Sequence, residues 1–187
     1  LIKMTKFSFL TLFSLMISLY GHRLTYSPEE FLVGQSKCFL LDANSSPKDK
    51  PWVWYAPTLP MIPGPSHTWY IDKLIEEGIS FAGCDQGEVR GSPASIQRFT
   101  EFYNEMVKRG YSKKPALLGQ SRGGLMMLSW AVRNPNKVGA FAGIYPVQNL
   151  RSWPIKRNLS ATLHDFEMDE KTFFQMIDEH NPINHLA

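Results

Sequence analysis

Cysteine is scarce in this chain, and its scarcity limits the chemistry available. Only two of the 187 residues are cysteines, Cys38 and Cys84, and they fit neither a zinc-binding spacing nor a framework of several disulfides. Two interpretations stay open, a single disulfide or two buried thiols, and two buried thiols are favoured.

An excess of either charge is also lacking. Lysine and arginine number 20 against 17 aspartates and glutamates, which gives a net charge of +3. No basic stretch is dense enough to bind nucleic acid, and Lys113-Lys114 is typical of a solvated loop. We therefore expect no nucleic-acid partner. The hydrophobic content of 43% is sufficient for a packed core in about one domain.

Clusters of histidine, cysteine and carboxylate residues at metal-ligand spacing are missing from the sequence, as is a nucleotide-binding glycine loop. We therefore expect neither a metal nor an organic cofactor.

Long hydrophobic runs are missing too, apart from the uncharged, mostly apolar stretch 7–20. This stretch is shorter than the about 20 residues that a membrane span needs. Lys3 and Lys6 precede it, as in the charged and apolar regions of a secretory signal. We predict a signal peptide over residues 1–21 and an extracytoplasmic protein, secreted or periplasmic, that meets the membrane only through this segment. A membrane-proximal anchor and a buried helix are the alternatives.

Strand-like and helix-like patterns alternate through the rest of the chain. Strands are predicted over 38–41, 52–56, 79–83, 115–118 and 138–145, and helices over about 68–78, 93–109, 123–134 and 169–179. The proline-rich segment 58–66 is expected to be an ordered loop across one end of the sheet. Trp69, Trp130 and Phe141 are expected in the core. The predicted fold class is α/β, a mostly parallel sheet flanked by helices.

The motif Gly119-Gln-Ser121-Arg-Gly123 directly follows a predicted strand and directly opens a predicted helix. This is the setting of a nucleophile elbow, in which a serine occupies a strained turn between strand and helix. Residues two positions to either side must lack side chains so that strand and helix can approach each other. The motif therefore predicts Ser121 as a nucleophile, Gly119 and Gly123 as elbow glycines, and the Arg122 N–H as an oxyanion donor.

With these residues in place, the stretch 52–150 resembles the α/β-hydrolase fold family, in its esterase and prolyl-oligopeptidase-like branch. The resemblance rests on the strand Trp52–Ala56, Asp85 and Gly91-Ser92 after the next strand, the Gly-Gln-Ser-Arg-Gly motif, and Asn134-Pro135 before the strand that starts at Val138. It implies that a second oxyanion donor lies at Thr58, or at Leu59 if the register slips by one. Ala56-Pro57 stands where the family usually has His-Gly.

The resemblance also implies the chain order serine, acid, histidine for a catalytic triad. After Ser121 the sequence shows one clear strand and a helix, and it stops where a typical member would start the strand bearing the acid. We therefore expect a partial α/β-hydrolase domain over 22–187 without the C-terminal strands, with 146–187 as a cap or helical segment. The acid and the histidine are expected beyond Ala187.

Most of the other titratable residues are expected to have structural or surface roles rather than catalytic ones. His164 and Asp165 are adjacent in sequence, so their side chains point apart, and they are expected at the surface. His180 and His185 are expected as capping or solvent residues. Asp85 and Glu88 are expected to organise a loop, although Asp85 also lies near the site, and His67 lines a possible pocket.

The function expected from these features is a secreted serine hydrolase. It would cleave the carboxylic ester of a small molecule or carbohydrate through a Ser121 acyl-enzyme. Two alternatives stay open, a prolyl-oligopeptidase-like peptidase and a non-catalytic binding protein on the same scaffold. The peptidases commonly carry a large extra domain that 187 residues do not accommodate, which favours the esterase.

Overall fold

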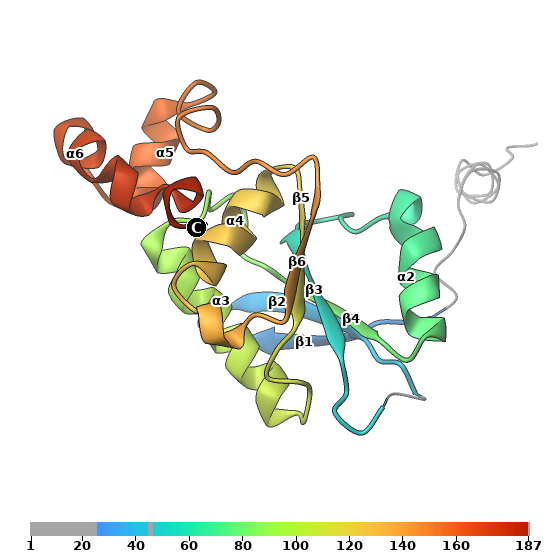
Figure 1. The fold of residues 1–187 in the computed structure, drawn as a ribbon. Helices are drawn as coiled ribbons and strands as arrows, with labels where there is room; N and C mark the ends of the chain where they lie inside the picture. The colour runs from blue at the N-terminus through green and yellow to red at the C-terminus, as the bar shows by residue number, and fades with distance from the viewer. Residues whose placement is uncertain (1–25, 45–46, 187) are drawn as a thin grey trace, which may run out of the picture.

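A six-stranded mixed sheet forms the centre of the computed structural model, which describes residues 26–44 and 47–186 (Figure 1). Helix α2 (Thr68–Glu76) covers one face of the sheet, and α3 (Pro93–Lys108) and α4 (Arg122–Ala131) cover the other. The predicted signal peptide over 1–21 lies outside the described residues.

The sheet has the spatial order β1-β2-β4-β3-β5-β6. Its strands are β1 (Glu29–Val33), β2 (Ser36–Leu41), β3 (Trp52–Thr58), β4 (Ser80–Asp85), β5 (Ala116–Gln120) and β6 (Ala140–Ile144). β4, β3, β5 and β6 pair in parallel, whereas β2 pairs antiparallel with both β1 and β4. The predicted α/β class with a mostly parallel sheet is confirmed.

The two faces of the sheet bury separate apolar clusters. Trp54 of β3 is fully buried against Phe99 and Phe102 of α3 and against Trp130 of α4. On the other face, Tyr55 packs in a cluster with Ile71 and Ile75 of α2. Because β3 is central and covered on both faces, its sequence is a continuous apolar run rather than an alternating one.

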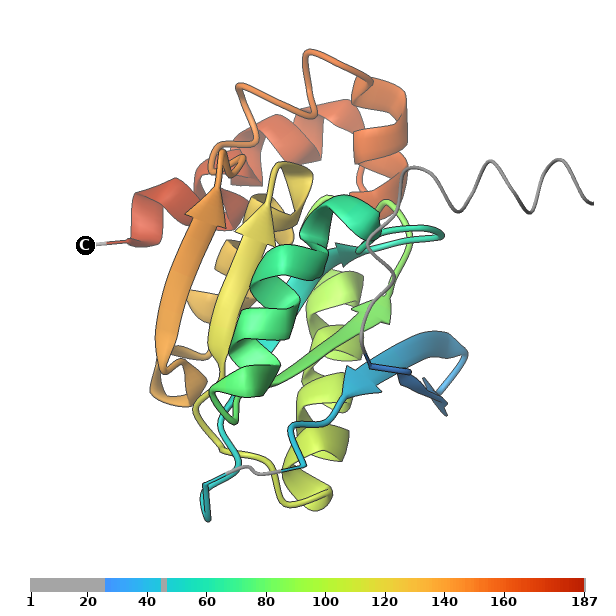
Figure 2. The ribbon, with the colours of Figure 1, turned by 90° about the vertical axis from the view of Figure 1, so that its right-hand side faces the viewer.

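A helical segment follows the sheet and lies beyond the ends to which β5 and β6 point (Figure 2). It contains α5 (Leu159–Phe166), α6 (Glu170–His180) and the 3-10 turn η3 (Pro182–His185). Phe166, Phe173 and Ile177 pack together with Leu125 of α4 and with Leu150. This cluster fixes the segment to the rest of the molecule. Two more 3-10 turns are η1 (Pro65–His67) and η2 (Pro135–Lys137).

Two details differ from the sequence-based expectations. Trp69 is 72% exposed on α2, so its assignment to the core is wrong, whereas Trp130 is fully buried and Phe141 packs at the core's margin. Cys38 and Cys84 face each other on β2 and β4 and are joined as a disulfide, not kept as two thiols. They meet because the antiparallel pairing of β2 with β4 brings together residues that are distant in the sequence.

Candidate active site

Ser121 lies at a tight turn between the end of β5 and the start of α4. Its backbone angles are φ 51° and ψ −123°, in a region that non-glycine residues rarely occupy. The Ser121 N–H donates to the Ile144 carbonyl at 2.9 Å, and the Ser121 carbonyl accepts from the Val147 N–H at 2.8 Å. The backbone on both sides of the serine is therefore held to β6 and to the loop that follows it.

Glycines allow the close approach that this turn requires. A Cβ atom on Gly119 would lie 2.7 Å from the Gly124 Cα, and one on Gly123 would lie 1.9 Å from the Ala56 carbonyl oxygen. Both distances are far below van der Waals contact. Glycine is thus required at both positions, because the backbones of β5 and α4 pack closely against each other and α4 also packs closely against β3.

A pocket of about 290 Å³ opens beside Ser121. Its wall combines apolar and polar groups: Tyr55, Pro57, Ile62, His67, Gln120, Ser121, Arg122, Val147 and Trp153. Val147 and Trp153 come from the stretch between β6 and α5, so that part of the chain completes the pocket.

The three residues expected to supply oxyanion donors, Arg122, Thr58 and Leu59, differ in whether they lie beside Ser121. Arg122 is the first residue of α4, where the N–H has no intrahelical acceptor and the helix dipole is positive. The Leu59 N–H, in contrast, donates to the Ile62 carbonyl at 3.0 Å. Thr58 and Leu59 line a second hollow together with Asp85 and are not in the wall of the Ser121 pocket. The geometry therefore favours Arg122 over Thr58 and Leu59.

His67 is buried in the pocket wall, and both of its ring nitrogens are engaged. Nδ1 lies 3.0 Å from the Gly64 backbone nitrogen, and Nε2 lies 3.0 Å from the Gln120 Oε1. Gln120 also accepts a hydrogen bond from the Tyr55 hydroxyl at 3.0 Å. Sequence patterns did not single out Gln120 or Tyr55, because one is the variable residue of the motif and the other looks like an ordinary strand residue.

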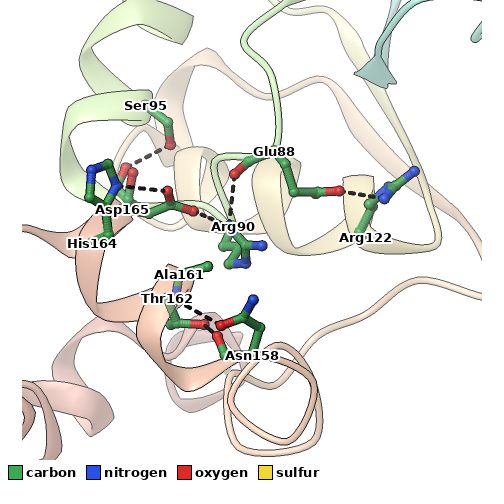
Figure 3. Close-up of polar contacts among 10 residues, drawn as sticks. Glu88, Arg90, Ser95, Arg122, Asn158, Ala161, Thr162, His164 and Asp165 are labelled. Carbon is green, nitrogen blue, oxygen red and sulfur yellow. Dashed lines mark hydrogen bonds and ion pairs between the residues drawn. The ribbon is translucent and has the colours of Figure 1, made fainter.

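The Arg122 side chain forms an ion pair with Glu88 in the loop after β4 (Figure 3). In the same loop, Arg90 donates to the Glu88 carbonyl at 3.0 Å and pairs with Asp165 of α5. The neighbour of the nucleophile is thereby connected to the helical segment. Asp165 is not an isolated surface residue as expected, because it provides the partner for a largely buried arginine.

Asp85 accepts a hydrogen bond from the Gly87 N–H at 2.8 Å, the loop-organising contact expected of it. The other three described histidines, His164, His180 and His185, are not in the wall of the Ser121 pocket. His164 is exposed on α5, and His185 lies 2.9 Å from the Glu179 carbonyl oxygen at the end of α6.

His180 is a correction to the expectation of a solvent residue. It is buried against Phe166, and its Nδ1 lies 3.2 Å from the Arg133 guanidinium. Burial, aided by the Arg133 charge, lowers the pKa of His180 below its ordinary value.

Over residues 26–44 and 47–186, no group of three or more histidine, cysteine or carboxylate side chains is arranged to hold a metal ion. Within the same residues, none of the helices has the length and apolar character needed to cross a membrane.

Comparison with solved structures shows what the fold is similar to. A puromycin-hydrolysing peptidase from Mycobacterium tuberculosis matches with a TM-score of 0.62 and 14% identity, over 86% of this chain and 29% of that one. Oligopeptidase B from Trypanosoma brucei matches with a TM-score of 0.61 and 15% identity, over 87% and 27%. A post-proline cleaving enzyme from Rickettsia typhi matches with a TM-score of 0.59 and 14% identity, over 87% and 27%.

The chain thus spans less than a third of the length of these structures. No protein-family model and no curated protein matches the sequence. At identities this low the likeness concerns the fold, and it agrees with the resemblance drawn from the motif. The described residues form part of an α/β-hydrolase fold, with Ser121 at the turn between β5 and α4.

Proposed function

We propose that this protein is a serine hydrolase in which Ser121 attacks the acyl carbonyl of a carboxylic ester. The observation that carries the proposal is the strained turn at Ser121, which opens helix α4 beside a pocket. A backbone this strained persists only where its surroundings impose it, and such sites are often functional.

In the proposed reaction, the Ser121 Oγ forms a bond to the carbonyl carbon and passes its proton to a general base. The Arg122 N–H stabilises the negative charge on the carbonyl oxygen of the tetrahedral intermediate. The alcohol leaves with a proton from the base, and water then releases the acid from the acyl-enzyme.

We infer that the general base does not come from the described residues. Both nitrogens of His67 are engaged with Gly64 and Gln120, and His164, His180 and His185 make contacts away from the pocket wall. We infer that the histidine and the acid belong to a part of the protein beyond these residues. Experiments therefore require the full natural polypeptide.

Labelling of the full polypeptide with a fluorophosphonate tests the proposal, because this probe reacts with activated serines. We expect stoichiometric labelling at Ser121 and hydrolysis of p-nitrophenyl butyrate. Ser121→Ala should remove the label and lower kcat/KM by at least about 10³-fold. Ser160→Ala, a matched change on the exposed side of α5, should retain both. Absence of labelling in the wild type would overturn the proposal in favour of a non-catalytic binding protein.

A peptidase activity is the second candidate, because the solved structures reported above are peptidases by their titles. The kcat/KM values for an ester and for an amide with the same acyl group distinguish the two. After correction for the intrinsic reactivity of each bond, the ester should be preferred; a preference for the amide would establish the peptidase instead.

A further inference from the structure

The side chain of Gln120, adjacent to the nucleophile, is held from three directions. Its Oε1 accepts from the Tyr55 hydroxyl at 3.0 Å and lies 3.0 Å from the His67 Nε2. Its Nε2 donates to the Tyr145 hydroxyl at 2.9 Å. These partners come from β3, from η1 and from the residue after β6, so the fold fixes the amide in one orientation.

The direction of this network follows from a backbone group. The Gly64 N–H points at the His67 Nδ1 over 3.0 Å, and its hydrogen is fixed by the peptide plane. The Gly64 carbonyl oxygen lies 3.1 Å from the same Nδ1, but it already accepts from the His67 backbone N–H at 2.9 Å. We therefore assign the lone pair to Nδ1 and the imidazole proton to Nε2. Nε2 then donates to Gln120, whose carbonyl oxygen has both lone pairs occupied.

As a consequence, two hydrogen-bond donors of the network remain without a partner inside it. The Gln120 amide nitrogen has a second hydrogen, and the Tyr145 hydroxyl, which accepts from Gln120, has its own hydrogen to donate. Tyr145 is 70% exposed, so this hydrogen is within reach of a bound molecule.

Tyr70 lies near the same network but does not line the pocket. Its ring lies 6.0 Å from the His67 ring, and its buried hydroxyl has no hydrogen-bond partner among the described residues. Burial also raises the pKa of both Tyr55 and Tyr70, so their hydroxyls stay protonated. The Tyr70 hydroxyl is itself too buried to contact a molecule in the pocket, so the donors offered there are those of Gln120 and Tyr145.

We propose that Gln120, which lines the pocket, and Tyr145, which is bonded to it, form a specificity subsite that binds an ether or carbonyl oxygen in the acyl group of the substrate. The inference rests on the proposed function, since it names the acyl group that Ser121 would receive. The pocket wall also contains the apolar side chains of Ile62, Val147 and Trp153. An acyl chain with an oxygen a few bonds from the carbonyl can accept hydrogen bonds from the donors and pack its carbon atoms on the apolar side chains. A plain alkyl chain leaves the donors unpaired.

Two p-nitrophenyl esters of almost equal shape test this subsite in the full polypeptide. Methoxyacetate places an ether oxygen where butyrate has a methylene group. After each kcat/KM is divided by the ester's rate of alkaline hydrolysis, the wild type should prefer methoxyacetate by about tenfold. Tyr145→Phe and Gln120→Met should reduce this preference to within about twofold, because each removes a donor.

Tyr103→Phe provides a matched control, since it removes a tyrosine hydroxyl that bonds to the Lys113 carbonyl on α3's side of the sheet. It should retain the tenfold preference. Equal corrected values for the two esters in the wild type, or an unchanged preference in Tyr145→Phe and Gln120→Met, would overturn the subsite alone. Failure to hydrolyse either ester, without labelling of Ser121, would overturn the proposed function and the subsite together.

Discussion

Gly123 shows at the scale of one residue how closely the elbow is packed. An added Cβ would lie 1.9 Å from the Ala56 carbonyl oxygen and 2.1 Å from its carbon. These are backbone atoms of β3, so no side-chain rotation can relieve the clash. Any side chain at this position must displace either α4, which carries the Arg122 N–H, or the strand that borders the pocket.

Gly123→Ala should therefore reduce the free energy of unfolding by about 3 kcal/mol or more and remove fluorophosphonate labelling of Ser121. Gly87→Ala is the matched control, because Gly87 has φ 69° but open space where its Cβ would be. Its cost should be about 1 kcal/mol, from the left-handed backbone alone. Urea denaturation measures both, and equal losses would contradict the argument from close approach.

The nucleophile was accessible to sequence reasoning because the motif is local: Gly119, Ser121 and Gly123 are spaced by the turn itself. The partners of Gln120 were not accessible. His67 is 53 positions away, and Tyr55 is 65 positions away. Only the pairing of β3 with β5 and the position of η1 bring these side chains together.

At the scale of the element, a largely buried ion pair joins α5 to the loop after β4. The side chains of Arg90 and Asp165 are only 13% and 17% exposed, and Arg90 also bonds to the Glu88 carbonyl. The pair between Arg151 and Asp178 of α6 is much more exposed, at 48% and 71%. Water screens the second pair and leaves the first comparatively strong.

Asp165→Asn should lower the free energy of unfolding by about 2–3 kcal/mol, because it leaves the charge of Arg90 poorly solvated and without its carboxylate. Asp178→Asn, the same chemical change on α6, should cost less than about 1 kcal/mol. Hydrogen exchange should show faster opening of residues 159–166 in the first variant. Similar losses in the two variants would mean that burial of the Arg90–Asp165 pair does not matter.

Elements with strong apolar periodicity were predicted well, and half-exposed ones were missed. The prediction for 93–109 differs from α3 (Pro93–Lys108) by one residue. Strand β1 (Glu29–Val33) was not predicted, because an edge strand with mostly exposed side chains carries little pattern. Helix α5 was predicted only as part of a cap or helical segment over 146–187, since it is short and its ion-pair partner Arg90 lies in a distant loop.

At the scale of the whole molecule, His180 joins the helical segment to the layer of α4. It packs on Phe166 and touches Arg133, whose pKa burial lowers, and Glu179 is the nearby acidic residue that acts in the opposite sense. Protonation of His180 would place a second positive charge beside a buried guanidinium. The folded protein therefore favours the neutral form of the His180 imidazole.

Because the pKa of His180 is lower in the folded than in the unfolded protein, unfolding takes up a proton in the window just below about pH 6.5. Stability should be full above this pH and decrease as the pH falls through it, by at most about 1.4 kcal/mol per pH unit from this group. His180→Gln should have a shallower dependence than the wild type in urea denaturation between pH 5 and 7. His185→Gln, at an exposed site, should retain the wild-type slope; parallel curves for all three proteins would rule out His180 as the source.

The arrangement of the whole sheet went beyond what the sequence could predict. The alternation of elements predicted an α/β fold, and the resemblance carried by the motif implied an α/β-hydrolase fold. The comparisons confirm both. The order of the strands and the meeting of Cys38 with Cys84 depend on long-range pairing, for which periodicity contains no information.

The contacts from Arg122 through Glu88 and Arg90 to Asp165 make the outer surface of α5 relevant to events at Ser121. Energetic coupling between two binding events is reciprocal. If occupancy of the pocket shifts Arg122, and with it Glu88, then the affinity of anything that docks on α5 changes by some factor. The same docking must then change the affinity of the pocket by that same factor. A molecule that docks on α5 would therefore act on the pocket through a helix that contributes no residue to the pocket wall.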